Sequence, residues 1–114
     1  MLFFSNKGLV WYKLAESLQD FIFNDQGLAE YEVAGKKVCI AVKDGQPFAC
    51  AHKCPHAGAP MAKGYVDALG NIVCPLHRYK FSLKNGRNVS GEGYYLKTFP
   101  VEIREDGIFI GITP

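Results

Sequence analysis

The strongest constraint on the fold is a series of tight-turn signals that cut the chain into short apolar segments. Five such turns each contain a glycine or an asparagine, which can adopt the positive φ that a tight hairpin turn requires. They lie at residues 33–36, 43–45, 68–71, 84–86 and 105–107. Hardly any window of a dozen residues between them keeps a helical period, so the pattern predicts short β-strands.

The segments between the turns predict an all-β fold. Eight strands are expected, at Val10–Leu14, Leu28–Val33, Lys37–Val42, Pro47–Ala51, Asn71–Cys74, Lys80–Leu83, Lys97–Arg104 and Ile108–Ile110. Residues 15–18 have the length of one helical turn, but Lys13 and Leu14 ahead of them supply no capping side chain. The sequence therefore leaves that turn undecided. The predicted architecture is an antiparallel β-sandwich, with two sheets packed face to face.

Length and composition fit one globular domain over residues 1–114. The chain has 114 residues, of which 48% are hydrophobic and 21% charged, a composition that argues against disorder. Its 13 basic and 11 acidic residues give a formal net charge of +2, with both signs interspersed. That charge is too small to indicate nucleic-acid binding.

The apolar segments are too short to predict a membrane anchor. The longest uninterrupted one, Val38–Val42, falls far below the roughly 20 residues that cross a bilayer. Residues 1–10 have no basic region ahead of their apolar side chains, which argues against a signal peptide. A soluble, cytoplasmic protein is therefore expected, and its four cysteines are expected to be metal ligands or buried thiols rather than disulfides.

Two irregular loops carry the unusual chemistry. The first contains Cys54-Pro55-His56 and the second Cys74-Pro75-Leu76-His77, with seventeen residues between His56 and Cys74. Two cysteines and two histidines can hold one tetrahedral zinc ion, but zinc fingers usually place Cys with Cys and His with His. One Cys and one His in each loop suits a two-iron cluster better, because each iron then takes two protein ligands.

The spacing Cys-x-His, seventeen residues, Cys-x-x-His resembles the Rieske [2Fe–2S] motif, in which two histidines replace two cysteines on one iron. The neighbouring residues that also match this family are Gly58, Pro60, Met61, Gly64, Phe81 and Asn85-Gly86. The resemblance implies that Cys54 and Cys74 bind a buried iron and that His56 and His77 bind an outer iron. It also implies a cluster-binding subdomain at about residues 50–84.

Four positions depart from the high-potential, membrane-anchored Rieske proteins. Ala59 and Leu76 stand where those proteins carry a loop disulfide. Tyr79 and Phe81 stand where they place Ser and Tyr hydroxyls against the cluster sulfurs. Losing two such hydrogen bonds is expected to lower the reduction potential by on the order of 100–250 mV. The expected potential is therefore at the low end of the family, roughly −150 to 0 mV.

These departures resemble the soluble Rieske ferredoxins of ring-hydroxylating oxygenases, and equally the small Rieske-type subunit of NAD(P)H nitrite reductase. Either resemblance implies an electron-transfer component that is not catalytic on its own. Its expected partners are a flavoprotein reductase as donor and a terminal oxygenase or nitrite reductase as acceptor. A hypothesis from another class is a non-redox, zinc-binding interaction module.

Several residues near the loops have more than one interpretation. Cys50 and His52 also form Cys-x-His, but Gly58 and Met61 match the family only when counted from Cys54. Cys50 is therefore interpreted as a packed strand residue, His52 as a polar side chain at the start of the loop, and Cys39 as a core residue. A set of cations could form a basic rim that steers an acidic partner, or could simply be solvated. These are Lys53, Lys63, Arg78 and Lys80.

Overall fold

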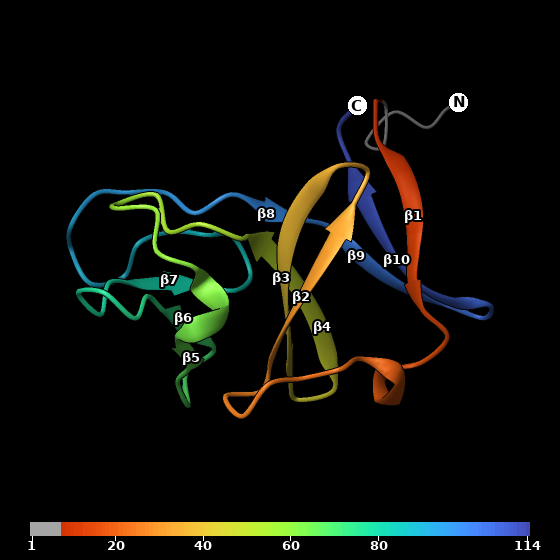
Figure 1. The fold of residues 1–114 in the computed structure, drawn as a ribbon, viewed down its shortest axis with the longest axis horizontal. Coiled ribbons are helices and arrows are strands. Elements are labelled where there is room, and N and C mark those ends of the chain that lie inside the picture. The colour runs from red at the N-terminus through yellow and green to blue at the C-terminus, as the bar shows by residue number, and fades with distance from the viewer. Residues whose placement is uncertain (1–7) are drawn as a thin grey trace.

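A computed structural model describes residues 8–114 as three antiparallel β-sheets arranged along the longest axis of the molecule (Figure 1). The first sheet contains β1 (Val10–Ala15), β10 (Gly107–Ile112) and β9 (Val101–Arg104), in that order. The second contains β2 (Leu28–Val33), β3 (Lys36–Lys43), β4 (Gln46–Ala51) and β8 (Thr98–Phe99). The third contains β5 (Tyr65–Val66), β6 (Asn71–Val73) and β7 (Lys80–Ser82). Each of the eight predicted strand segments coincides with at least one of these strands, which confirms the predicted all-β class.

The first two sheets form the predicted sandwich, and the second sheet is buried on both faces. Along β3, Val38 and Ile40 face the first sheet, where they pack with Ile108 and Ile110 of β10. The alternate residues Cys39 and Ala41 belong to a second core on the opposite face. This double burial explains why β3 is a continuous apolar run, since only a strand exposed on one face shows alternation.

Two hairpin turns have the backbone geometry that the sequence predicts. Between β2 and β3, Ala34 and Gly35 have φ of 52° and 81°. Between β3 and β4, Asp44 and Gly45 have φ of 53° and 77°. Two successive positive φ angles are those of a type I′ turn, whose twist matches that of the flanking strands.

The structure corrects three details of the predicted strands. The strand expected over Lys97–Arg104 is interrupted at Pro100, so that β8 pairs with β4 and β9 pairs with β10. Proline has no backbone N–H to donate, and the chain changes sheets there. The two-residue strand β5 was not predicted, because it is too short to show alternation. The helical turn left undecided at residues 15–18 does not form there: Ala15 ends β1, and a 3₁₀ turn (η2) follows at Leu18–Asp20, where the Ser17 N–H donates to the Asp20 carboxylate at 3.2 Å.

The third sheet belongs to an insertion between two neighbouring strands. β4 and β8 pair through Ala49 with Phe99 and Cys50 with Thr98, and the intervening residues 52–97 form what we call the inserted subdomain. It also contains a 3₁₀ turn, η3 (Met61–Lys63). The second core joins it to the sandwich, with Phe81 and Met61 fully buried against Leu28. Asn24 adds a polar link by donating to the Ala62 carbonyl at 2.7 Å.

Within residues 8–114, no helix has the length and apolar character needed to cross a membrane. The sequence prediction that the chain lacks a signal peptide concerns residues 1–10, and the first seven of these lie outside the described residues.

Candidate metal centre

The two loops that carry the candidate ligands have the same backbone design. In the first, the Cys54 N–H donates to the Ala59 carbonyl and the Gly58 N–H donates to the Cys54 carbonyl, both at 2.8 Å. In the second, the Cys74 N–H donates to the Tyr79 carbonyl at 2.8 Å and the Arg78 N–H to the Cys74 carbonyl at 3.1 Å. Each loop therefore closes on its own cysteine and holds it in a fixed position.

The two loops bring the four candidate ligands together as two pairs. Cys54 and Cys74 are 2% and 1% exposed, and their thiols lie within hydrogen-bonding reach of each other. His56 is half-buried and His77 exposed, and their Nδ1 atoms lie 3.5 Å apart. The cysteines thus form the inner side of the site and the histidines its outer side.

This arrangement fits a two-iron cluster better than a single ion. Two nitrogens bound to one metal ion at about 2.1 Å and a tetrahedral angle lie about 3.4 Å apart, close to the observed Nδ1 separation. Among residues 8–114, however, no three His, Cys, Asp or Glu side chains converge as a single-ion site. Two separate pairs are what a cluster with two ligands on each iron requires.

The protein environment favours the protonated form of the Cys74 thiol. Burial raises the pKa of the Cys74 thiol to about 11, the Leu76 N–H opposes this shift, and the adjacent Cys54 thiol reinforces it. A thiol must lose its proton to bind iron, so the positive charge of the metal has to replace this proton.

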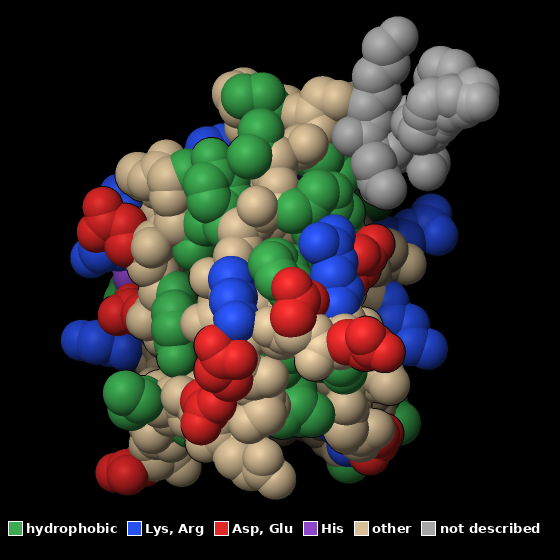
Figure 2. All heavy atoms as spheres, turned by 90° about the vertical axis from the view of Figure 1, so that its right-hand side faces the viewer, with side chains coloured by type: hydrophobic (Ala, Val, Ile, Leu, Met, Phe, Trp, Pro, Cys, Tyr) green, Lys and Arg blue, Asp and Glu red, His purple; other side chains and the backbone are tan. Residues whose placement is uncertain are grey.

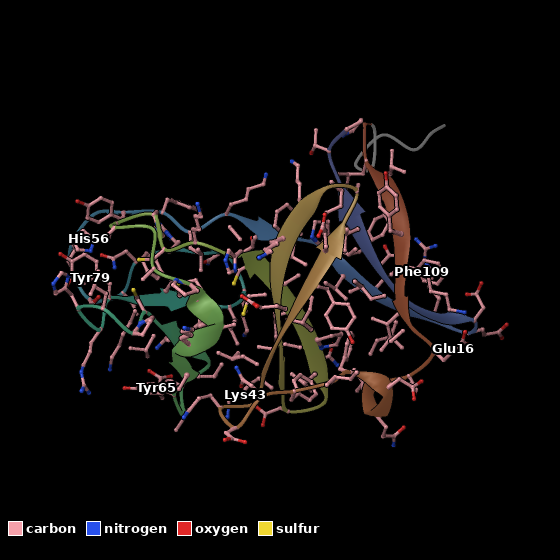
Figure 3. The ribbon with its side chains drawn as sticks, viewed as in Figure 1. Glu16, Lys43, His56, Tyr65, Tyr79 and Phe109 are labelled. Carbon is pink, nitrogen blue, oxygen red and sulfur yellow. The ribbon has the colours of Figure 1, made fainter. Side chains whose placement is uncertain are left out.

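Tyrosine rings pack beside the outer histidine pair, and Figure 3 labels His56 and Tyr79 next to each other. The Tyr79 ring lies 4.3 Å from the His56 ring, centre to centre, with 31° between their planes. Tyr94 approaches the same imidazole at 5.3 Å, and Tyr79 also lies 6.2 Å from the His77 ring. Tyr79 therefore packs beside both histidines, as its size suggests and unlike the serine of high-potential proteins.

A third loop, residues 88–93, carries Tyr94 to this position, and the sequence analysis missed it. Asn88 accepts hydrogen bonds from the Glu92 and Gly93 N–H groups and donates to the Lys80 carbonyl at 3.1 Å. Hydrogen bonds from Ser90 and Asn88 lower the pKa of Glu92. The run of Asn, Ser and Gly in this segment is a turn signal, but nothing in it indicates which side chain reaches a histidine.

Two glycines allow the close backbone contacts that support the loops. A Cβ at Gly64 would lie 1.8 Å from the Val73 carbonyl oxygen. A Cβ at Gly86 would lie 1.8 Å from the oxygen of Leu96. Only glycine permits these approaches, which explains the presence of both residues in the motif that the sequence analysis singled out.

The remaining cysteines and the third described histidine lie apart from the two pairs. Cys39 and Cys50 face each other across β3 and β4, and each is 1% exposed. A hydrogen bond with Cys39, together with burial, raises the pKa of the Cys50 thiol. His52 Nδ1 lies 2.9 Å from a Glu30 carboxylate oxygen, off the line of a well-aligned hydrogen bond. Cys50 is thus a packed strand residue that contacts Cys39 instead of Cys74.

Comparison with known proteins identifies the family. Residues 10–100 match the model of the Rieske [2Fe-2S] domain. The chain belongs to the Rieske [2Fe-2S] domain family. A 71-residue alignment with the 3-phenylpropionate/cinnamic acid dioxygenase ferredoxin subunit of Photorhabdus laumondii shows 32% identity, covering 61% of this chain and 68% of that protein. The alkene monooxygenase ferredoxin component of Xanthobacter autotrophicus is 24% identical over 84 residues, covering 74% of this chain and 69% of the relative.

A protein of known structure shares the fold. The NADH-dependent nitrite reductase small subunit of Mycobacterium tuberculosis superposes with a TM-score of 0.79 at 20% identity. The superposition covers 93% of this chain and 97% of that one. At this identity, the likeness shows the architecture alone.

Membership in the Rieske family decides between the two chemistries that the sequence left open. The cofactor is a Rieske-type [2Fe–2S] cluster, and the protein is a one-electron carrier. The alternative of a non-redox zinc module receives no support from the relatives or from the paired geometry.

Proposed function

We propose that this Rieske protein is the ferredoxin of an oxygenase system. It takes single electrons from an NAD(P)H-dependent flavoprotein reductase and passes them to a terminal oxygenase or a similar metalloenzyme. The relatives named above, a dioxygenase ferredoxin subunit and a monooxygenase ferredoxin component, support this role. The observation that carries it is the separation of a buried cysteine pair from an outer histidine pair.

In this proposal, Cys54 and Cys74 hold the inner iron as thiolates, and His56 and His77 hold the outer iron through Nδ1. When bound, the cluster supplies one reversible electron at low cost in nuclear rearrangement. The closed hydrogen-bonded loops keep the cysteines in place, and the burial of both thiols keeps water away from the inner side. The inserted subdomain acts as the cluster-binding unit.

The outer histidine pair is the proposed route for the electron. His77 is exposed, whereas His56 is covered by Tyr79 and Tyr94. A partner that docks against this end reaches the imidazole of His77 without displacing protein. The chain itself supplies no catalytic step, since the substrate chemistry belongs to the terminal enzyme.

The cytoplasm is the proposed compartment, because the flavoprotein donors that use NAD(P)H work there. A second candidate is the small subunit of NAD(P)H nitrite reductase, which is favoured by the full-length superposition on such a subunit. The ferredoxin role has the better support, because the dioxygenase ferredoxin subunit named above is 32% identical to this chain, against 20% for the nitrite reductase small subunit. Co-purification with a nitrite reductase catalytic subunit would instead establish the second candidate.

Analysis of the purified protein for iron, acid-labile sulfide and zinc tests the cofactor and its ligands. We expect two irons and two sulfides per chain, and a Cys74→Ser variant that has lost the cluster. A Cys50→Ala variant, which changes a buried cysteine outside the site, is expected to keep it. A fully coloured Cys74→Ser protein would refute the ligand assignment. Stopped-flow mixing with NADH and the reductase of a dioxygenase system then tests the donor, with rapid bleaching of the cluster expected.

A further inference from the structure

Charge is divided unevenly between the two ends of the molecule. The inserted subdomain, residues 52–97, carries seven Lys or Arg and two Asp or Glu, a net charge of +5. The other described residues, 8–51 and 98–114, carry five Lys or Arg and nine Asp or Glu, a net charge of −4. The overall charge of +2 hides this separation, because the two ends nearly cancel.

The separation runs along the longest dimension of the fold. The molecule measures 42 × 30 × 26 Å, and the inserted subdomain forms one end of the 42 Å axis (Figure 1). Figure 2 views the other end, where Asp and Glu side chains are spread among Lys and Arg. The candidate metal centre, marked by His56 and Tyr79 in Figure 3, lies at the far tip of the positive end.

Local ion pairs leave unpaired charge of opposite sign at the two ends. At the acidic end, Lys13 pairs with Glu16 at 2.6 Å, Arg104 with Glu102 at 2.9 Å and Lys43 with Asp44 at 3.9 Å, which leaves the other carboxylates in excess. In the inserted subdomain the described ion pair is Lys80 with Asp67, at 3.8 Å. Six exposed cations of this subdomain have no carboxylate partner among residues 8–114. They are Lys53, Lys63, Arg78, Lys84, Arg87 and Lys97.

The tip also exposes apolar side chains next to the histidines. Leu76, which precedes His77, is 46% exposed, and Tyr94, which contacts His56, is 40% exposed. Tyr95 is 64% exposed. An apolar centre within a charged rim is the usual composition of a protein interface, where the rim governs the rate and orientation of encounter.

We propose that the inserted subdomain docks tip-first against an acidic protein surface, with the charge separation turning the long axis of the molecule toward that partner. This inference rests on the proposed electron-carrier function and adds the chemistry of the partner: a surface rich in Asp and Glu around its own redox centre. Opposite charge on the approaching surfaces raises association rates by 10- to 10³-fold at low salt. Because the electron leaves near His77, correct orientation before contact shortens the search for a productive complex.

Voltammetry of the cluster-loaded protein on two charged surfaces tests this orientation. The probes are gold electrodes that carry either a carboxylate-terminated or an amine-terminated alkanethiol monolayer. At about 10 mM salt, where the Debye length is about 30 Å, we expect electron transfer at least about tenfold faster on the carboxylate surface. At about 1 M salt, where the Debye length is about 3 Å, the difference should disappear. Equal rates on both surfaces at low salt, or a faster rate on the amine surface, would overturn the proposal.

Charge-reversal variants locate the effect in the inserted subdomain. Arg78→Glu and Lys53→Glu should each slow transfer on the carboxylate surface several-fold. Lys36→Glu, which makes the same change in net charge at the β2–β3 hairpin, should leave the rate unchanged. Iron content and visible absorption confirm an intact cluster in each variant. An equal loss of rate in all three variants would show that only net charge matters, which contradicts the proposal.

A measurement that needs no cluster separates this inference from the proposed function. On a carboxylate cation-exchange resin, Arg78→Glu and Lys53→Glu should elute at clearly lower salt than Lys36→Glu. If the protein contains no iron, the proposed carrier function is wrong, but the elution of the three variants still shows whether the inserted subdomain binds an acidic surface. If the cluster is present but the three variants elute together, the docking inference fails and the carrier function stands.

Discussion

Gly58 and Arg78 occupy equivalent positions in the two ligand loops. Each donates its N–H to the carbonyl of the cysteine four residues before it, and each has a positive φ, 76° for Gly58 and 60° for Arg78. Glycine adopts this conformation freely, whereas a residue with a Cβ loses roughly 1–2 kcal/mol. The second loop therefore keeps a strained arginine where the first loop has the favourable residue. In the docking proposal above, Arg78 compensates for its strained backbone by placing a positive charge beside His77, where the partner approaches.

Relief of that strain gives the first prediction. Arg78→Gly should stabilise the protein by about 0.5–1 kcal/mol, because the released strain exceeds the roughly 0.5–1 kcal/mol that glycine loses in backbone entropy. Gly58→Ala should destabilise it by about 0.5–1 kcal/mol, because the backbone strain of a Cβ residue exceeds the entropy gained on losing glycine, even though the added Cβ meets open space. Guanidinium unfolding of the cluster-loaded variants measures both. A destabilised Arg78→Gly protein would show that the side chain makes contacts that offset the strain.

The close contact at Gly86 gives the second prediction. Gly86 and Gly35 have φ of 77° and 81°, so alanine suffers the same backbone strain at either position. At Gly86 its Cβ would in addition lie 1.8 Å from the Leu96 oxygen. Gly86→Ala should therefore lose about 1–3 kcal/mol more in free energy of unfolding than Gly35→Ala. Similar losses in the two variants would mean that the segment carrying Leu96 moves aside without strain.

The turn between β5 and β6 gives the third prediction, which concerns pH. Burial of Asp67 opposes its ionisation, but hydrogen bonds from Asn71 and Leu69 outweigh this effect and lower the pKa of the carboxyl. A carboxyl with a lowered pKa stabilises the fold above its unfolded value of about 3.9, and the contribution is lost as the pH falls through the folded pKa. Asp67→Asn should lower the free energy of unfolding by about 1 kcal/mol at neutral pH.

The difference between wild type and Asp67→Asn should therefore shrink as the pH falls below about 4. Urea unfolding at pH 7 and at low pH provides the measurement. A difference that stays constant over this range would show that Asp67 acts through shape and not through its charge.

The environment of Phe81 gives the fourth prediction. Phe81 is fully buried in the core behind the cysteines and has no hydroxyl to donate, and the Tyr79 ring lies against His56. The reduced cluster therefore lacks the two side-chain donors of high-potential Rieske proteins, and the potential should lie at roughly −150 to 0 mV. Equilibrium redox titration followed by the visible spectrum checks it. A potential several hundred millivolts higher would show that other donors reach the cluster.

Local chemistry explains which parts of this fold could be predicted from sequence. The hairpin turns at Ala34-Gly35 and Asp44-Gly45 are predictable because positive φ restricts the residue types. The ligand loops are predictable in outline because cysteine, histidine and proline recur at short spacing. The sheet change at Pro100 was missed, since a proline that interrupts an apolar run indicates a break without showing that the two halves join different sheets.

The position of Tyr94 depends on long-range contacts. It reaches His56 only because Asn88 and the Lys80 carbonyl shape the third loop. No local period or turn signal encodes such a contact. The sequence alone also does not show that the charges are separated in space. Residues 52–97 become one end of the molecule only because β8 pairs with β4 and thereby sets the intervening residues apart from the sandwich.

That return has a consequence for how such a molecule can change. The inserted subdomain leaves the sandwich after Ala51 and re-enters at Thr98, on strands that are hydrogen-bonded neighbours. Its ends are therefore held together by the sheet whatever its length, and loop-closure entropy grows only slowly with added residues. Insertions or deletions within residues 52–97 can remodel the redox end while the register of β2, β3 and β4 stays the same. The sandwich can thus keep its structure while the sequence and length of the cluster-binding subdomain vary.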